Sequence, residues 1–479
     1  MRFPRRRSEV LSNVFYLGLG DLGSRIVSFV AFIYVARVLG PDKLGLIGFG
    51  ASAVALAVPI ADYGLGFVGT REVSRNPASL KFYIKTILFD RLILGIIALT
   101  CYVFVVELFF DDPEKVVILL LYGFTLLPAM VTLTWAYQGV GQTGWFTFEK
   151  NVQAVLYLGA MLVFVRWPGD VDRVPVAYTV SALLPAAVVL SYYTRRNARP
   201  QTRLDVRFSI NLLRSSFKLF VPTLLSQINL SIGLLLVVYF SSLKEAGYFS
   251  AASKILLLSA AVPNLLWSSF YPVLSRSAIR DTPETGVSVA ILYKYAVLIG
   301  ITPVFFGLLF SRELVNILFG LPYEDAVVPF RLFTVVASLQ FMSIVFTRIL
   351  PAFGQEKAFS RIVTGGVVIQ VVASLALVPH FGASGAASSF ILAEACVAAS
   401  AIFLVRRMIT VHLLRQPIVS IAVLSLCYLI VMGVRTLVDI PLLACLIAIA
   451  VLYVFSLAAT SVISMSDFLP LASTVGERS

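Results

Sequence analysis

Apolar runs of about 20 residues recur along this 479-residue chain, from its first residues almost to its last. A helix of that length crosses the hydrocarbon core of a bilayer, where only helices and closed barrels satisfy every backbone hydrogen bond. The runs are continuous and lack the two-residue alternation of barrel strands. The sequence therefore predicts an all-α integral membrane protein.

The composition excludes several classes of protein. Apolar residues make up 59% of the chain and charged residues 13%, against about 45–50% and about 25% in soluble domains. A water-soluble enzyme, a disordered chain and a nucleic-acid-binding module are therefore excluded. The net charge of +13 follows from membrane topology and anionic lipid headgroups, so no nucleic-acid partner is expected.

Metal, redox and ATP chemistry have no motif in this sequence. The four cysteines stand singly inside apolar runs, and the two histidines have no second ligand at metal spacing. No Walker A motif occurs, so active transport would have to draw on a gradient. We therefore expect no metal, no cofactor and no primary pump.

About fourteen membrane-spanning helices are predicted from the apolar runs. With the N-terminus inside, Lys and Arg gather on the inner side of this arrangement, as the positive-inside rule requires, and both termini are cytoplasmic. The expected spans are 11–36, 44–68, 82–106, 116–137, 146–165, 174–192, 217–243, 246–274, 287–310, 326–350, 362–378, 383–405, 418–434 and 441–463.

The two halves of the chain echo each other on either side of a basic stretch that begins at Arg195. Gly141-Gln142 and Gly354-Gln355 each precede an apolar helix, and the turns at 42–45 and 244–247 each lead into a helix of small residues. Six helices per repeat would relate the copies by a pseudo-two-fold axis along the membrane normal. The predicted domains are an N-terminal six-helix bundle (1–194), a basic cytoplasmic linker (195–216), a C-terminal six-helix bundle (217–410), and two additional helices with a tail (411–479).

Charged and polar side chains inside the predicted spans are the candidate site, because a charge at a helix centre costs roughly 2.5–3.5 kcal/mol and is kept where it faces a cavity or a partner. A cationic lumen would suit a phosphate or an acidic sugar. The predicted substrate-binding cations are Arg25, Arg91, Lys254, Lys294 and Arg348. The predicted polar-lumen or ion-coupling residues are Asp21, Asp62, Asp90, Gln227, Asn229 and Glu394.

Some of these residues have an alternative interpretation. Lys294 and Arg348 could instead extend to lipid headgroups, since long cationic side chains near helix ends do so. Gln227 and Asn229 could line a cavity or hold helices together. Asp21 and Arg25 are four residues apart and share a helix face, so a local ion pair is expected. Trp135, Tyr137 and Trp145 are expected in an aromatic belt at the membrane interface, and some aromatic side chains could instead stack on sugar rings.

Several short motifs resemble a known family. Residues 13–17 (Asn-Val-Phe-Tyr-Leu) and 34–41 (Tyr-Val-Ala-Arg-Val-Leu-Gly-Pro) frame the first helix, and Asp-Tyr-Gly-Leu at 62–65 precedes Gly-Thr-Arg-Glu at 69–72. The Gly-Gln pairs and Phe-Gly-Ala-Ser-Gly-Ala-Ala at 381–387 follow. With these motifs the chain resembles the polysaccharide exporter, or Wzx-like oligosaccharide flippase, family of the MOP superfamily, to which MATE extruders and lipid II flippases also belong.

The resemblance implies two six-helix bundles around a central cavity. It implies a flippase that moves a polyprenyl-(pyro)phosphate-linked oligosaccharide across the cytoplasmic membrane by alternating access, for surface polysaccharide or O-antigen assembly, and not an enzyme. The implied partners are that lipid-linked oligosaccharide, membrane lipids, H+ or Na+ as a coupling ion, and glycan polymerase machinery.

Two other functions stay open from the sequence. An ion-coupled extruder of drugs or organic cations should have more acidic than basic residues inside its spans, whereas here the two are balanced. A membrane enzyme of polysaccharide polymerisation, the more distant alternative, should present acidic or histidine side chains on a long outer loop, and the longest one expected here, near 311–325, is short.

Overall fold

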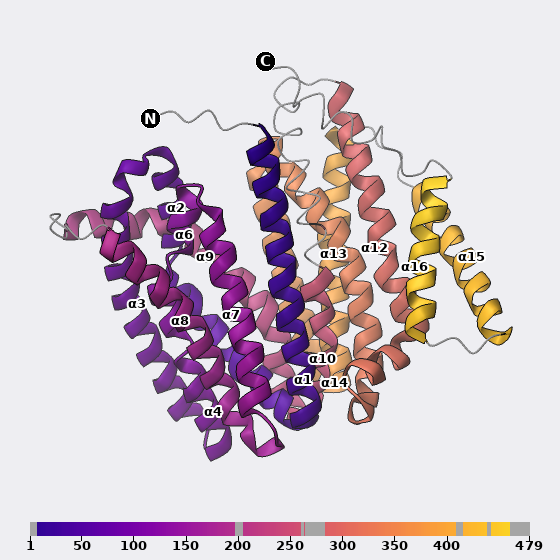
Figure 1. The fold of residues 1–479 in the computed structure, drawn as a ribbon, viewed down its shortest axis with the longest axis horizontal. Coiled ribbons are helices and arrows are strands. Elements are labelled where there is room, and N and C mark those ends of the chain that lie inside the picture. Colours follow the sequence, from indigo (N-terminus) through magenta and orange to yellow (C-terminus); the bar gives the residue numbers. More distant parts are fainter. Residues whose placement is uncertain are drawn as a thin grey trace. The chain divides into compact units, whose positions relative to one another are not determined.

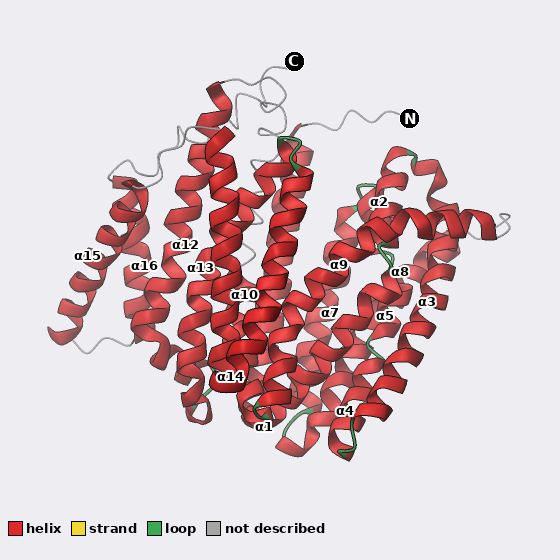
Figure 2. Ribbon diagram, turned by 180° about the vertical axis from the view of Figure 1, so that it is seen from behind, coloured by secondary structure: helices red, strands yellow, loops and turns green. Residues whose placement is uncertain are grey.

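The computed structural model describes residues 7–196, 205–259, 263, 283–408, 415–437 and 442–459. In these ranges the regular structure is helical and contains no strand (Figure 2). Eight of the described helices are long and apolar enough to cross a membrane, which confirms the predicted all-α membrane fold. The predicted number of fourteen crossings and the layout of two bundles stay predictions.

The chain forms two compact units. Unit 1 comprises residues 1–258, 312–330 and 367–390, and unit 2 comprises 259–311, 331–366 and 391–479. Unit 1 contains α1 (Arg7–Asp62), α2 (Leu65–Arg75), α3 (Leu80–Phe109), α4 (Pro113–Gly123), α5 (Leu126–Val131), α6 (Thr134–Gly139), α7 (Thr143–Phe164), α8 (Arg173–Arg196), α9 (Val206–Phe240) and most of α10 (Leu243–Ser259). Unit 2 contains most of α12 (Pro283–Leu318) and α13 (Val327–Ala352), parts of α14 (Glu356–Met408), and α15 (Arg415–Leu437) and α16 (Leu442–Ala459).

The helix α1 covers the first two predicted spans and reverses direction between them. Gly40 has φ 74° and ψ 175°, a conformation that side chains other than glycine rarely adopt, and Pro41 starts the returning segment. The second segment ends at Asp62 rather than at the predicted Val68. The reason is local, since Tyr63 and Gly64 both have positive φ, 49° and 74°. We call the end of unit 1 where α1 begins the near end, and the end at Gly40 the far end.

The fourth predicted span is not one continuous helix. It is divided into α4, α5 and α6, and the last break falls at Thr132, whose backbone is extended. At the far end, Asp112 caps α4 by accepting a hydrogen bond from the Glu114 backbone N–H at 3.1 Å. A hydrogen bond from the Lys115 ammonium lowers the pKa of the Asp112 carboxyl below its ordinary value.

The predicted linker 195–216 is partly helical. α8 continues to Arg196, and α9 begins at Val206, eleven residues before the predicted start at Phe217. Asp205 caps α9 by accepting from the backbone N–H groups of Arg207 and Phe208 at 2.9 and 3.2 Å. The first turns of α9 run across the direction of the membrane helices in unit 1 (Figure 1).

Two pieces of local geometry recur in the two halves of the chain, while the repeat of two six-helix bundles stays a prediction. Gly141 and Gly354 have φ 71° and 72°, and the following glutamines each donate a backbone hydrogen bond of 2.9 Å to the residue five positions earlier, which is a Schellman helix end. At the far end of unit 1, a Cβ on Gly45 would collide with the Leu243 carbonyl, and one on Gly247 would collide with the Pro41 carbonyl. The two contacts are reciprocal, because Gly247 follows Gly45 by 202 residues and Leu243 follows Pro41 by the same number.

Two of the three aromatic residues expected at the interface lie in the interior instead. Trp135 and Tyr137 are 3% and 5% exposed and pack in a cluster with Leu65, Ile87 and Leu212. The belt interpretation of these two residues is therefore wrong. The short helix α6 directs both side chains into the protein, where they pack against residues of α2, α3 and α9.

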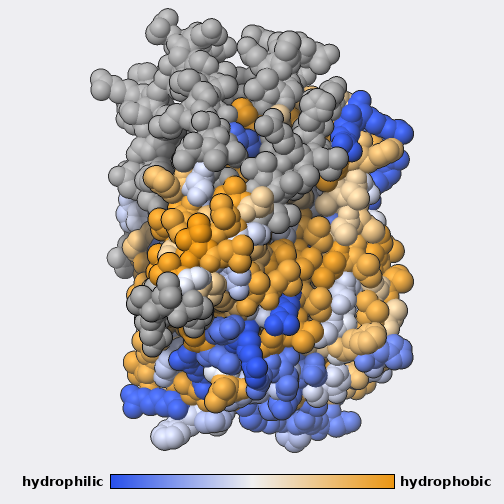
Figure 3. All heavy atoms as spheres, turned by 90° about the vertical axis from the view of Figure 1, so that its right-hand side faces the viewer, coloured by the Kyte–Doolittle hydropathy of each residue, from blue (hydrophilic) through white to orange (hydrophobic). Residues whose placement is uncertain are grey.

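The helices of unit 2 cover the later predicted spans. Four of these spans correspond to α12, α13, α15 and α16. The Tyr453 hydroxyl of α16 donates a hydrogen bond to the Leu298 carbonyl of α12 at 3.0 Å. α14 covers two spans with a break at Gly382, which has positive φ and belongs to unit 1. Residues 260–262 and 264–274 of the predicted span 246–274 lie outside the described residues. On the face that Figure 3 shows, apolar side chains form a broad band with hydrophilic ones gathered below it, as a lipid-facing surface requires.

Candidate functional site

A group of charges gathers along one side of the first segment of α1. Arg25 Nε donates to Asp21 Oδ2 at 2.8 Å, so the expected ion pair is present. Lys150 of α7 donates to the other oxygen, Oδ1, at 3.2 Å. One carboxylate therefore lies between two cations from two helices. Because Gly20 has no side chain, α7 approaches α1 closely here, and a Cβ at Gly20 would collide with Thr147.

A third cation approaches the same side of α1 farther along. The Lys254 ammonium of α10 lies 4.7 Å from the centre of the Phe32 ring, a cation–π contact. Phe32 follows Asp21 by eleven residues, which places it about 16 Å along the helix and about 20° around it. Figures 1 and 2 show α1 between α7 and α10 within unit 1.

We call Asp21, Arg25, Lys150 and Lys254 the α1 cationic face. It contains three cations and one carboxylate, and Lys254 has no ion-pair partner among the residues that the structure describes. The side chains of Arg25, Asp21 and Lys150 are 23%, 32% and 41% exposed. An excess of partly exposed cations inside membrane helices can attract an anion, because hydrocarbon does not compensate their charge.

A second charged group in unit 1 is built differently. Arg91 of α3 forms an ion pair with Asp62 at the end of α1, and it donates to the Thr132 carbonyl at 3.0 Å. The Arg91 side chain is only 5% exposed. One arginine thus connects the turn after α1 with the break between α5 and α6. Arg91, predicted as a substrate-binding cation, and Asp62 compensate each other here.

An acidic residue of α7, which the sequence analysis did not single out, contacts the break at Thr132. The Thr132 hydroxyl donates to Glu149 Oε1 of α7 at 2.8 Å. Glu149 is 7% exposed, and its other carboxylate oxygen has no hydrogen-bond partner in the described part of the chain. The Arg91 contacts and this hydrogen bond together join α1, α3, α5 and α7.

The remaining predicted residues of unit 1 lie on α3 and α9. Asp90 accepts a hydrogen bond from Ser209 and is 3% exposed, so it fastens the first turns of α9 to α3. The Gln227 amide donates to the Ala55 carbonyl of α1 at 3.3 Å, which is a contact between helices. Asn229 is half-buried two residues later in α9.

Unit 2 contains the other three predicted residues. Glu394 of α14 accepts a hydrogen bond of 2.6 Å from Ser343 of α13. Arg348 is half-buried in α13, five residues after Ser343. Lys294 of α12 lies 5.7 Å from the centre of the neighbouring Tyr295 ring. Their roles as lumen residues stay predictions.

Lys150 and Glu149 are the functional candidates that the sequence analysis missed. A signal was available, because Glu149, Lys150 and Asn151 are three consecutive polar residues inside the fifth apolar run. Asn151 donates to the Gly20 carbonyl at 3.1 Å, so all three residues face other helices.

The fold is the one found in solved structures of membrane transport proteins. It is similar to the structure of the lipid II flippase MurJ in an inward closed conformation, with 14% identity and a TM-score of 0.72, over 94% of this chain and 100% of that one. It is also similar to an inward-facing MATE multidrug-resistance transporter of the MOP superfamily, with 17% identity and a TM-score of 0.62, over 80% of this chain and 94% of that one.

The family follows from the sequence itself. Residues 10–278 match the family described as polysaccharide biosynthesis protein, and the chain belongs to it. A relative from Escherichia coli (strain K12), whose name assigns it to O-antigen transport, is 21% identical over 400 residues, which cover 82% of this chain and 96% of that protein. The resemblance stated from the short motifs is thereby confirmed.

Proposed function

We propose that this protein is a flippase that moves a polyprenyl-(pyro)phosphate-linked oligosaccharide across the cytoplasmic membrane by alternating access, with both termini in the cytoplasm. The α1 cationic face carries this proposal. A phosphate-bearing headgroup has the charge that complements this face, and it has to be kept out of hydrocarbon during passage. The family and the name of the Escherichia coli relative support the same class of substrate.

In the proposed mechanism, Asp21 holds two cations until the substrate arrives. Arg25 and Lys150 both donate to this carboxylate, at 2.8 and 3.2 Å. A phosphate offers more acceptor oxygens than a carboxylate, in a geometry that arginine can bind with two hydrogen bonds. Arg25 and Lys150 therefore donate to the phosphate instead of to Asp21. Asp21 then lacks its partners, and binding of H+ or Na+ neutralises it. We therefore assign ion coupling to Asp21.

Release on the opposite side requires the far end of unit 1 to open. The Tyr323 hydroxyl donates to the Ala36 carbonyl and Arg37 Nε donates to the Leu318 carbonyl, both at 2.8 Å. The reciprocal contact of Gly45 and Gly247 lies at the same end. These contacts join the first part of the chain to later parts, and in alternating access they separate when the substrate leaves.

The sign of the charge argues against an extruder of organic cations. Such a substrate would be repelled by the three cations of the α1 cationic face, of which Arg25 and Lys150 pair with Asp21. An anionic headgroup would be attracted to the same place. The proposal therefore predicts that removing positive charge from α1 and its neighbours weakens transport.

The test uses a strain that lacks the chromosomal copy of this gene and expresses variants from a plasmid. Arg25→Gln and Lys254→Gln should abolish surface polysaccharide and cause the lipid-linked precursor to accumulate, at wild-type levels of protein in the membrane. Arg173→Gln is the matched control, because this arginine is 53% exposed at the start of α8 and pairs with Asp170, away from the α1 cationic face. Unchanged surface polysaccharide in both test variants would refute the proposed function.

A further inference from the structure

The first turns of α9, residues 206–217, form a helical segment that runs across unit 1 and packs against α3. The Phe208 ring packs edge-on against Phe82 and Tyr83, with ring centres 4.6 and 5.6 Å apart. Ser209 donates to Asp90, and Leu212 is 5% exposed. In Figures 1 and 2 this segment runs across the membrane helices of unit 1. It therefore has the orientation of a helix that lies in the plane of the membrane surface.

The outward side of this segment has two adjoining stripes. At 100° per residue, an apolar stripe of Val206, Ile210, Leu213 and Phe217 shares one face. Three of these residues are strongly exposed, Val206 at 66%, Ile210 at 46% and Phe217 at 50%. The neighbouring stripe is basic and exposed and contains Arg207, Arg214 and Lys218. Apolar and basic stripes side by side are typical of helices whose apolar face reaches acyl chains and whose basic face reaches phosphates.

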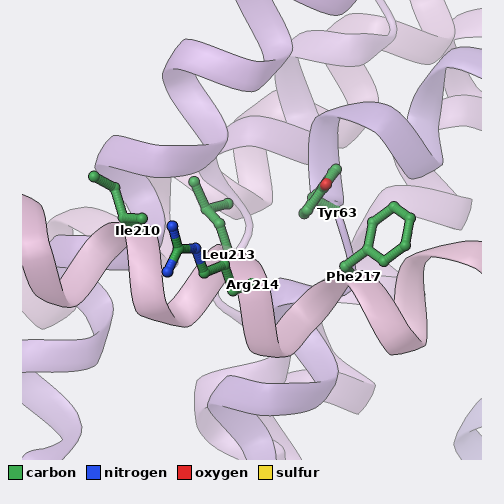
Figure 4. Close-up of a pocket in the computed structure, with 5 residues that line it drawn as sticks. All are labelled: Tyr63, Ile210, Leu213, Arg214 and Phe217. Atoms are coloured by element: carbon green, nitrogen blue, oxygen red, sulfur yellow. The ribbon is translucent and has the colours of Figure 1, made fainter.

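The two stripes meet at a cavity of about 320 Å³. Figure 4 shows its lining, which is Tyr63 from the turn after α1 and Ile210, Leu213, Arg214 and Phe217 from α9. The Tyr63 ring is stacked on Phe220 with centres 4.7 Å apart, which fixes one wall. Arg214 is exposed and has no ion-pair partner among the described residues, so its charge is available to a ligand.

The chemistry of this lining selects the ligand. One guanidinium and one phenol hydroxyl stand among apolar side chains, which suits a phosphate ester attached to an acyl chain. The volume is near the lower end of the roughly 300–1,000 Å³ typical of small-molecule sites, which is enough for a compact phosphate headgroup. We propose that this cavity binds an anionic phospholipid, with the phosphate on Arg214 and an acyl chain along Ile210 and Phe217.

This inference is independent of the proposed transport function, because no residue of the α1 cationic face lines the cavity. The occupied site would fix the turn at Tyr63 against α9. A bound lipid should therefore also stabilise the protein against thermal unfolding, since it binds the folded state alone.

The test titrates the purified full-length protein in detergent with dioleoyl-phosphatidylglycerol or dioleoyl-phosphatidylcholine and counts bound lipids by native mass spectrometry. The anionic lipid should bind more tightly at one site and raise Tm. Arg214→Gln should weaken that binding by about fivefold to tenfold and remove the rise in Tm. Arg361→Gln, which replaces an exposed arginine of α14 outside the cavity, should behave as wild type. Phe217→Ala should weaken binding of the anionic lipid while Arg214 is intact.

Three outcomes would overturn the inference. The first is equal affinity for the two lipids, and the second is wild-type affinity in Arg214→Gln. The third is that undecaprenyl phosphate or inorganic phosphate occupies the site through Arg214 while phosphatidylglycerol does not, which would assign the site to a substrate headgroup or a free anion. A protein that binds phosphatidylglycerol normally and yet fails to transport would refute the proposed function and leave this site intact.

Discussion

Unit 1 contains two groups of charged residues that differ in burial and in balance. Arg91 and Asp62 compensate each other, and their side chains are 5% and 23% exposed. The α1 cationic face has three cations for one carboxylate, and its described ion-paired side chains are 23–41% exposed. A buried, compensated pair fixes the positions of helices, because breaking it leaves a bare charge. An exposed and unbalanced group leaves charge available to a ligand. The first group should therefore control stability and the second transport.

Arg91→Met should give the largest effect. It leaves the Asp62 carboxylate without its partner at the end of α1 and removes the hydrogen bond to the Thr132 carbonyl. The free energy of unfolding in detergent should fall by about 3–5 kcal/mol. Circular dichroism during denaturant unfolding measures this loss. The double variant Asp62→Asn with Arg91→Met should recover part of it, and an equal or larger loss in the double variant would contradict the compensated-pair interpretation.

Gly247→Ala should affect both the stability of the protein and its transport activity. The new Cβ meets the Pro41 carbonyl, a backbone atom that cannot rotate away. Overpacking of this kind costs about 1–3 kcal/mol, and it keeps the far end from closing. Unfolding and transport should therefore both change. Gly159→Ala is the matched control, since a Cβ there meets nothing within 4 Å. Equal behaviour of the two variants would show that the reciprocal glycine contact is unimportant.

Asp21→Asn should separate stability from coupling. Its carboxylate is about one-third exposed at 32%, so solvent screens the two ion pairs and their loss should cost less than about 1 kcal/mol of stability. Transport in proteoliposomes should continue but should no longer respond to an imposed H+ or Na+ gradient. Asp112→Asn, outside the membrane helices, should keep the wild-type gradient response. A retained response in Asp21→Asn would remove Asp21 from the proposed coupling step.

Some features of the fold and of the candidate site could be predicted from the sequence and others could not, for physical reasons. Hydropathy predicts helices, because each apolar run has to satisfy its backbone within the membrane. The pair Asp21–Arg25 was also predictable, since it depends only on helix spacing. The break at Thr132 was not predictable, because apolar content does not report local backbone direction. Lys150 approaches Asp21 across 129 residues, and the pairing of Arg91 with Asp62 depends equally on tertiary packing.

Lys150→Gln should give the smallest effect and the most specific test of the comparison. Lys150 is the most exposed of the ion-paired members of the α1 cationic face, at 41%, so its contribution to binding is weakened by solvent. The apparent affinity for a polyprenyl phosphate, measured by quenching of intrinsic fluorescence, should fall by about twofold to fivefold, with Tm unchanged. Lys150→Arg keeps the charge and should keep the affinity. A loss of stability comparable to that of Arg91→Met would mean that Lys150 is a structural residue, and the distinction between the two groups of charges would fail.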